Sequence, residues 1–193
     1  MKVDLDALEK EFDNMINDTM LKVRESALVS CFGLSNKSIL MWSHYAQKHK
    51  GICLEYEVPD NSEFKFVKYK RREPVFKLRK LMEYIFGHDF AEEKINTKED
   101  LYSFALVPLL TKYKDWKYEK EVRCVLPSNA TDEKVWKDGD KFLLKMPKPK
   151  RIFVGCNADE IFIENVKAKA GDIPVFFMKM IDGKYAIKEK EEY

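Results

Sequence analysis

The chain has 193 residues, of which 45% are hydrophobic and 13% aromatic, so its composition is that of one globular domain with a sizeable core. The 35 Lys and Arg residues nearly balance the 33 Asp and Glu residues, and a net charge of +2 excludes a broadly basic nucleic-acid-binding surface. The sequence shows neither a leader-like segment nor an apolar run of membrane-spanning length, so we expect a cytoplasmic protein without membrane association.

The first predicted elements are a helix, a strand, a second helix and a second strand. Residues 3–26 carry apolar side chains at steps of three and four, which predicts an amphipathic helix. The apolar run 27–32 is typical of a strand. Residues 38–50 predict a helix that ends at Gly51, because glycine is common just after a helix C-terminus. Alternating apolar and polar residues over 52–58 predict the next strand.

The rest of the chain adds strands and helices without strict alternation. This mixture predicts an α+β fold, with a mixed or antiparallel sheet and helices packed on it. We expect an N-terminal helix over residues 1–27 and a single α+β domain over residues 28–193. The predicted strands are 64–69, 118–126, 141–146, 151–156, 174–181 and 184–189, and the further predicted helices are 77–95, 98–110 and 157–170.

The stretch MWSHYAQKHKG, residues 41–51, gathers aromatic and histidine side chains. On a helical wheel Trp42, Tyr45 and His49 share one stripe, whereas His44 falls on the other side. We therefore expect Trp42 and His49 to be more buried than His44. Two interpretations stay open for the stripe. Its side chains pack in the core, or Tyr45 and His49 border a cleft and contact a ring-bearing ligand.

We expect neither a metal site nor a disulfide. His44 and His49 are five residues apart, so on a helix they point about 140° away from each other, whereas a helical metal pair needs a spacing of three or four. The four cysteines are widely spread and form no CxxC pair.

A second group of candidate residues lies in KDWKYEKEVRCV, residues 114–125. A period of two places Glu119, Glu121 and Arg123 on one face of the predicted strand, opposite a mostly apolar face. Such a charged face is typical of a solvent-exposed surface with cross-strand ion pairs. The alternative is a functional carboxylate pair at the start of a strand, with an arginine that binds an anionic group.

Four stretches of the chain resemble a bacterial family known as domain of unknown function 2971. The chain departs from the family pattern before Ser30, where family members usually begin with a strand reading Leu-Tyr-Lys-Tyr-Arg and this sequence has the amphipathic helix. The resemblance therefore implies a shortened or divergent member, and the family's name assigns no activity. The matching stretches are SCFGLSN (30–36), LMWSHYAQKHKGICLEY (40–56), LLTKYKDWKYEKEVRC (109–124) and RIFVGCNADE (151–160).

The family pattern is in turn similar, more distantly, to the ADP-ribosyltransferase superfamily. That resemblance implies NAD as the cofactor. It implies that Glu121 stabilises the positive charge that develops when the nicotinamide–ribose bond breaks, and that Glu119 orients or deprotonates the acceptor. It also implies a set of ligand-binding residues around the ring, ribose and pyrophosphate: Trp42, His44, Tyr45, His49, Lys114 and Arg123.

Three functions stay open on these grounds. The first is an NAD-using transferase or a degenerate relative. The second is a non-catalytic ligand-binding or interaction module in bacterial stress or phage defence. The third is a hydrolase or nuclease that acts on nucleotides or nucleic acid, for which the basic runs 68–73 and 145–151 give weak support because such runs are usually solvated. A nucleotide or other small molecule is the expected partner, and the sequence does not fix the oligomeric state.

Overall fold

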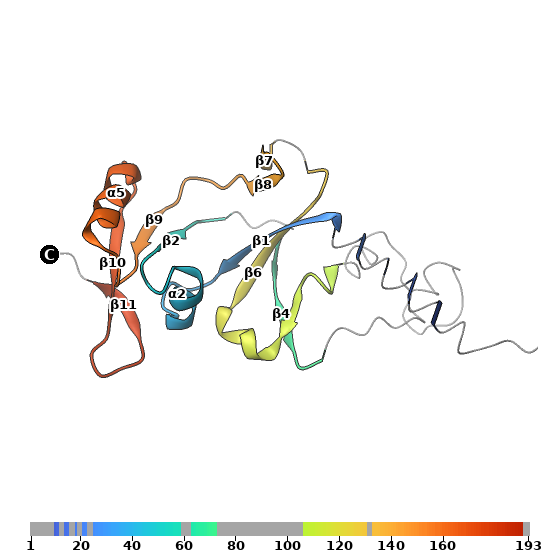
Figure 1. The fold of residues 1–193 in the computed structure, drawn as a ribbon, viewed down its shortest axis with the longest axis horizontal. Coiled ribbons are helices and arrows are strands. Elements are labelled where there is room, and N and C mark those ends of the chain that lie inside the picture. Colours follow the sequence, from blue (N-terminus) through green and yellow to red (C-terminus); the bar gives the residue numbers. More distant parts are fainter. Residues whose placement is uncertain are drawn as a thin grey trace, which may run out of the picture.

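The computed structural model describes residues 10, 11, 14, 15, 18, 21, 22, 25–58, 63–72, 106–130 and 133–190. Over these residues the chain forms an α+β fold in which a short helix, α2, lies between two sheets (Figure 1). The helices predicted at 3–26, 77–95 and 98–110 fall wholly or largely outside the described residues and stay predictions. No helix in the described ranges has the length and apolar character needed to cross a bilayer.

The first sheet is antiparallel and has the strand order β1-β6-β3. Gly33 lies opposite Glu121 and Cys31 lies opposite Arg123, so the end of β1 meets the start of β6. One face of the sheet packs into a core that contains Cys124. The strands are β1 (Ala27–Gly33), β3 (Phe64–Phe66) and β6 (Glu121–Pro127).

The second sheet has the strand order β11-β10-β9-β2. Strands β9 and β10 are parallel, and helix α5 connects them, while the other pairs are antiparallel. Phe153 is fully buried here and packs in one core with Trp42 of α2. The elements are α2 (Ile39–Tyr45), β2 (Ile52–Glu55), β9 (Arg151–Val154), α5 (Glu160–Ala170), β10 (Val175–Met180) and β11 (Ile187–Lys190).

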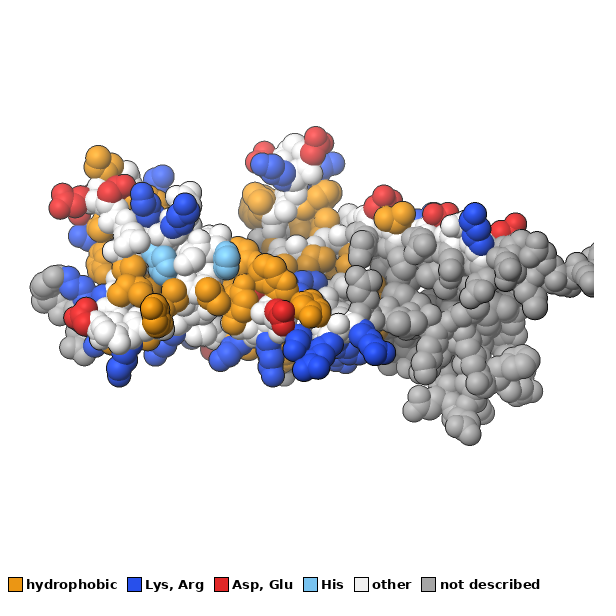
Figure 2. All heavy atoms as spheres, turned by 60° about the horizontal axis from the view of Figure 1, so that its bottom comes forward, with side chains coloured by type: hydrophobic (Ala, Val, Ile, Leu, Met, Phe, Trp, Pro, Cys, Tyr) orange, Lys and Arg blue, Asp and Glu red, His pale blue; other side chains and the backbone are white. Residues whose placement is uncertain are grey.

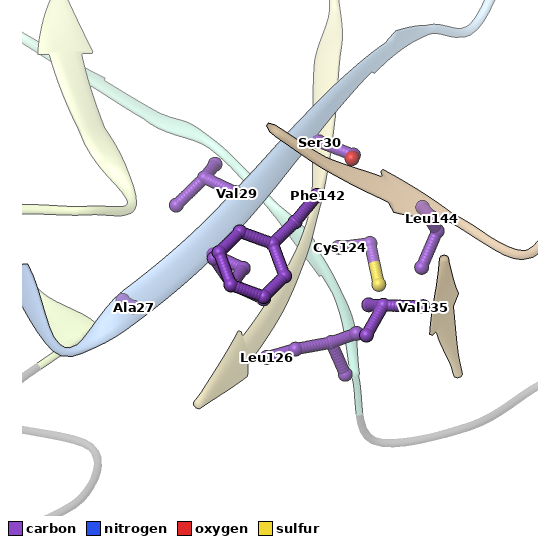
Figure 3. Close-up of a pocket in the computed structure, with 9 residues that line it drawn as sticks. Ala27, Val29, Ser30, Cys124, Leu126, Val135, Phe142 and Leu144 are labelled. Carbon is purple, nitrogen blue, oxygen red and sulfur yellow. The ribbon is translucent and has the colours of Figure 1, made fainter. Parts of the chain in front are cut away.

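Two strand pairs complete the described fold, and the sequence patterns missed one strand of each. Strands β4 and β5 are parallel, and β7 and β8 form an antiparallel hairpin. The hairpin covers one face of the first sheet around a cavity of about 200 Å³, with Phe142 and Leu144 above Cys124 and Leu126 (Figure 3). The elements are β4 (Lys68–Lys70), β5 (Thr111–Tyr113), β7 (Val135–Asp138) and β8 (Lys141–Leu144).

The helix expected over 38–50 ends at Tyr45, so the last part of that prediction is wrong. Gln47, Lys48 and His49 follow with φ values of 48°, 57° and 68°, which places three consecutive non-glycine residues in the left-handed region. Their backbone is held from outside the helix, because Asn157 donates its backbone N–H to the carbonyl of His49 at 2.9 Å. Hydrogen bonds within the segment close the turn as well, from His49 to Trp42 at 3.1 Å and from Gly51 to Ala46 at 2.8 Å.

The strand expected over 118–126 begins only at Glu121. Residues 114–119 form a 3-10 helix, η1 (Lys114–Glu119), and Lys120 adopts a left-handed conformation with a φ of 45°. Glu119 and Glu121 therefore do not share a strand face, and the period-two assignment of Glu119 is wrong. The assignment of Cys124 and Leu126 to the core face is confirmed, because their side chains are buried.

Candidate functional site

Glu119 and Glu121 are the two buried charged residues of the described chain, with exposed fractions of 4% and 5%. Glu119 closes η1 and Glu121 opens β6, so the left-handed residue between them turns both carboxylates inward. A buried carboxylate is costly unless a cation and hydrogen bonds satisfy it. Lys112 of β5 and Arg123 of β6 supply these partners, and we call the four residues the carboxylate network.

Lys112 joins the two carboxylates. Its ammonium group donates to Oε2 of Glu119 and lies 3.2 Å from Oε2 of Glu121. Arg123 holds Glu121 from the other side, with Nε at 2.8 Å from Oε1 and Nη2 at 3.2 Å from Oε2. The remaining guanidinium nitrogen, Nη1, donates to the carbonyl of Leu109. Two positive charges thus balance two negative ones inside the protein.

This pairing keeps Glu121 ionised. Burial by itself would raise the pKa of Glu121, but the hydrogen bonds and charge of Arg123, with hydrogen bonds from Cys31 and Lys112, lower it from 4.5 to about 2. Burial would likewise lower the pKa of Lys112, yet its hydrogen bonds to Glu119 and Glu121 raise it. Partial burial and the hydrogen bond to Glu121 raise the pKa of the Cys31 thiol to about 11. At neutral pH Glu121 is therefore ionised and lies beside a neutral Cys31 thiol.

Two tyrosines fix the network to neighbouring elements. Tyr45, the last residue of α2, donates its hydroxyl to Oε1 of Glu119 at 2.8 Å, and this bond raises the pKa of Tyr45. The backbone N–H of Glu121 donates to the hydroxyl of Tyr69 on β4 at 2.8 Å. Helix α2 and strand β4 thus both position the carboxylate pair.

An exposed group of rings lies beside the network. We call it the aromatic cluster: His44, Tyr45, Trp116 and Tyr118. The four measured centroid separations run from 6.0 Å, between Trp116 and Tyr118, to 6.5 Å, between His44 and Trp116. Tyr45 is 63% exposed and Trp116 is 40% exposed. Lys112 connects cluster and network, because its Nζ lies 5.0 Å from the centroid of the Trp116 ring.

On its other side, Tyr45 lines a cleft of about 710 Å³ between the two sheets. Cys31 lines it too, so each network carboxylate is bonded to a residue of the cleft wall. Glu121 and Arg123 themselves lie behind that wall and are not among the lining residues. The far end of the cleft is polar, since Arg151 makes hydrogen bonds of 2.7 to 3.0 Å to Glu55 there. The apolar walls include Phe32, Met41, Leu54, Phe64 and Phe153.

The other expected ligand-binding residues lie away from the carboxylates. Trp42 lines the cleft but is only 3% exposed, and its Nε1–H donates to the carbonyl of Asn36 at 2.6 Å. His49 places Nε2 at 2.9 Å from Oγ of Ser43, and its buried Nδ1 has no hydrogen-bond partner among the described residues. Lys114 begins η1, and no ion pair joins it to either carboxylate in the described ranges.

The expected difference in burial along the quoted stretch is confirmed. Trp42 is buried and His49 partly buried, whereas His44 and Lys48 are exposed. Tyr45 departs from the predicted stripe, because its ring is largely exposed and only its hydroxyl turns toward a buried carboxylate.

Sequence reasoning missed Lys112, Tyr69 and Cys31 as members of the site. No spacing rule relates Lys112 to Glu119, since Lys112 lies on strand β5 and Glu119 at the end of the 3-10 helix η1. Trp116 was inside the quoted segment 114–125, but the period-two pattern assigned only the strand after it. The structure shows that Trp116 lies on η1. The sequence did contain a sign of irregular structure between Tyr113 and Glu121. Three aromatic residues fall within six positions there, and this pattern fits no amphipathic strand.

Metal-ligating side chains and the basic run 145–151 are two further candidate features of the sequence. No group of three or more His, Cys, Asp or Glu side chains among them is placed to hold a metal ion, and all four cysteines are free. The basic run 145–151 is largely neutralised, because Lys148 pairs with Asp172 and Lys150 pairs with Glu57. Arg151 pairs with Glu55 in the same way.

These features define an α+β protein in which buried, ion-paired carboxylates lie beside an exposed aromatic surface and a cleft. Residues 41–124 match the family model described as "Protein of unknown function (DUF2971)". The matched segment includes α2 from Met41 onward, η1 and the whole carboxylate network, so the match supports the resemblance to this family at the residues of the site. No curated protein and no solved structure gives a match.

Proposed function

We propose that the protein binds a small molecule of the nucleotide class, NAD or a related compound, where the aromatic cluster meets the carboxylate network. The observation that carries this proposal is the position of Tyr45. Its ring belongs to the aromatic cluster and lines the cleft, and its hydroxyl is bonded to Glu119. One side chain therefore links a stacking surface, a cleft and a pair of buried, ion-paired carboxylates.

Each part of the site suits one part of such a ligand. Exposed aromatic rings stack on flat heterocycles, and this contact is worth about 1–3 kcal/mol per base. The carboxylate of Glu119 is buried and bonded to Tyr45 and Lys112, so the group that accepts a hydrogen bond from a sugar hydroxyl is the hydroxyl oxygen of Tyr45 at the cleft wall. The cleft of about 710 Å³ is within the usual size of small-molecule sites, roughly 300–1,000 Å³.

Tryptophan fluorescence offers a direct test. The chain has three tryptophans, Trp42 in the core, Trp116 in the aromatic cluster and Trp136 on the β7–β8 hairpin. Titration with NAD, ADP-ribose or AMP should quench emission in the wild type and in Trp136→Phe, but not in Trp116→Phe. Calorimetry should show that Trp116→Ala weakens binding about tenfold, because one stacking contact is lost. Absence of binding by all three compounds to the wild type would refute the proposal.

A second candidate function is transfer chemistry on NAD, and the ionisation of Glu121 is the observation that favours it. With a pKa of about 2, this carboxylate is negative at neutral pH and could stabilise a developing positive charge. Arg123 and Lys112 already bind its oxygens, however, which favours binding over turnover unless the ligand displaces one of them.

Nicotinamide release from NAD separates the two functions. If the protein is a transferase, Glu121→Gln should lower the rate on the order of 10²–10³-fold and leave NAD affinity nearly unchanged, because the carboxylate acts on charge present mainly in the transition state. Glu164→Gln on α5 is the matched control, since Glu164 is exposed and pairs only with Lys167 among the ion pairs of the described chain. If the wild type binds NAD but releases no nicotinamide, the transferase function is refuted and only the binding function remains.

A further inference from the structure

The basic run that begins at Lys68 lies on the outer face of β4. Lys68 and Lys70 are exposed there, and Lys70 lies opposite Tyr113 of the parallel strand β5. Side chains alternate between the two faces of a strand, so Tyr69 and Lys112 lie on the other face. Their hydrogen bonds to Glu121 and Glu119 confirm this. The lysines of β4 therefore point to solvent, on the side away from the carboxylate network.

The 3-10 helix η1 continues this positive charge and packs against β4 and β5. A 3-10 helix has about three residues per turn, so side chains three positions apart lie above one another. Lys114 and Lys117 therefore form one row, and Lys120 follows directly after the helix. Trp116 and Glu119 form a second row, which turns toward Lys112. The lysines thus border the aromatic cluster but lie on a different side of η1 from Trp116.

These basic side chains form no ion pair with any described residue. Residues 68–72 and 114–120 together contain two acids, the exposed Asp115 and the buried Glu119. Figure 2 shows basic side chains along the lower edge of the molecule, with hydrophobic ones beside them. A chain with a net charge of only +2 therefore carries a local excess of positive charge. We call its members the basic strip: Lys68, Lys70, Arg71, Arg72, Lys114, Lys117 and Lys120.

We propose that a single strand of nucleic acid binds along η1, with its bases on the aromatic cluster and its phosphates on the basic strip. This inference rests on the stacking surface of the proposed function and adds the neighbouring phosphates that only a strand supplies. Base and phosphate lie on opposite sides of the sugar, so a stacking surface and a phosphate-binding row must be adjacent without coinciding. The rings and the lysines on separate sides of η1 meet this condition.

The exposed rings favour a single strand over a duplex or a membrane. A duplex keeps the faces of its bases within its own stack, so it offers no stacking partner to Trp116 or Tyr45. An anionic bilayer would attract the lysines, but insertion of Trp116 would carry the exposed Asp115 beside it among anionic headgroups. In a complex with a single strand, the same carboxylate can accept a hydrogen bond from a base amino group.

Fluorescence anisotropy of the full chain with a labelled oligothymidylate of roughly 12 nucleotides tests the proposal. The dissociation constant should lie at about 1–100 μM and rise steeply between about 50 and 200 mM salt. The double variant Lys70→Gln, Lys117→Gln removes one lysine from each segment. It should make the slope of log K against log salt shallower by about 1.4, since each phosphate contact contributes about 0.7.

Two further proteins separate stacking from charge. Trp116→Ala should weaken binding about tenfold at every salt concentration and leave the salt slope unchanged, because it removes a ring and no charge. The double variant Lys179→Gln, Lys188→Gln is the matched control. It removes the same charge from two exposed lysines that lie opposite each other on β10 and β11, and it should bind like the wild type.

The oligothymidylate is compared with an RNA strand of equal length and with a duplex. Binding of either single strand in preference to the duplex supports the proposal, and the tighter of the two identifies DNA or RNA as the partner. Failure of the wild type to bind any strand would overturn it. So would equal losses in the two double variants, because these would show attraction by net charge alone. Binding to anionic phospholipid vesicles but not to the strands would assign the basic strip to a membrane.

The outcome for the proposed function is read separately. If NAD, ADP-ribose or AMP binds and no strand does, only this inference fails. If a strand binds and none of the three compounds does, the free mononucleotide is refuted as the ligand, while the strand-binding surface is supported. Loss of both kinds of binding in Trp116→Ala would show that they share one stacking surface.

Discussion

Tyr45 donates its hydroxyl to Oε1 of Glu119 at 2.8 Å and so joins α2 to η1 across 74 residues. The donor sits on a largely exposed ring, and the acceptor is almost fully buried. Tyr45→Phe keeps the ring and removes the donor to a charged buried oxygen, which should cost about 1–2 kcal/mol of unfolding free energy. Urea unfolding measures this loss. Tyr185→Phe, a change at a fully exposed ring, should leave the midpoint unchanged.

Lys112 is the cation that both buried carboxylates share, so its removal should be the most damaging single change in the network. Lys112→Met keeps the length of the side chain but leaves Glu119 and Glu121 facing each other without a shared charge partner. Breaking a buried pair in this way should cost about 3 kcal/mol. Lys167→Met, which breaks an exposed pair with Glu164, should cost less than about 1 kcal/mol. Equal losses in the two variants would show that the network contributes no more than a surface pair.

The pH dependence of stability should report on Glu121. Its folded pKa of about 2 lies below the ordinary value of 4.5, so the folded state favours the ionised form. The resulting stabilisation is fully present above pH 4.5 and is lost as the pH falls from 4.5 toward 2. Glu121→Gln should remove this part of the pH dependence, whereas Glu164→Gln should keep it. Unfolding free energies measured between pH 7 and pH 2 for the three proteins provide the comparison.

Gly155 allows the left-handed turn to approach β9. A Cβ atom at this position would lie 2.1 Å from the carbonyl oxygen of His49 and 2.6 Å from its carbonyl carbon, both backbone atoms. Gly155→Ala should therefore destabilise the protein by about 3 kcal/mol or more, since one segment must move. At Gly33 a Cβ would meet its nearest atoms at 3.5 Å, an ordinary contact. A thermal midpoint of Gly155→Ala close to that of Gly33→Ala would contradict this account.

Patterns that depend on neighbouring residues predicted much of the described fold. The strand at 27–32, the core face with Cys124 and Leu126, and the two C-terminal strands at 174–181 and 184–189 all follow from apolar runs or alternation over short distances. The α+β class follows from the mixture of elements. Helix α5 was also expected, although it begins at Glu160 after the N-cap Asp159 and not at residue 157.

The parts that sequence patterns missed depend on contacts between distant segments. The helix expected over 38–50 stops at Tyr45, and the turn after it is held by local hydrogen bonds and by Asn157. Glu119 lies on a 3-10 helix. The sequence pattern was typical of a surface carboxylate, but the side chain of Glu119 is buried and is bonded by Lys112 and Tyr45. A single sequence identified the two glutamates as candidates but could not show which cation accompanies them. Arg123 was expected to meet a ligand, and the structure places it on Glu121.

The left-handed turn at residues 47–49 has a consequence for how the chain acquires its structure. A non-glycine residue in this region costs on the order of 1–3 kcal/mol, and such a conformation persists only where tertiary contacts hold it. Here the contacts come from Asn157, whose backbone N–H bonds His49 at 2.9 Å and whose side chain bonds the carbonyl of Lys48 at 3.3 Å. Local hydrogen bonds from His49 to Trp42 and from Gly51 to Ala46 close the same turn, so Asn157 adds to a structure that its own segment begins. A fragment cut to the family-matched limits 41–124 would keep these local bonds and lose both bonds from Asn157.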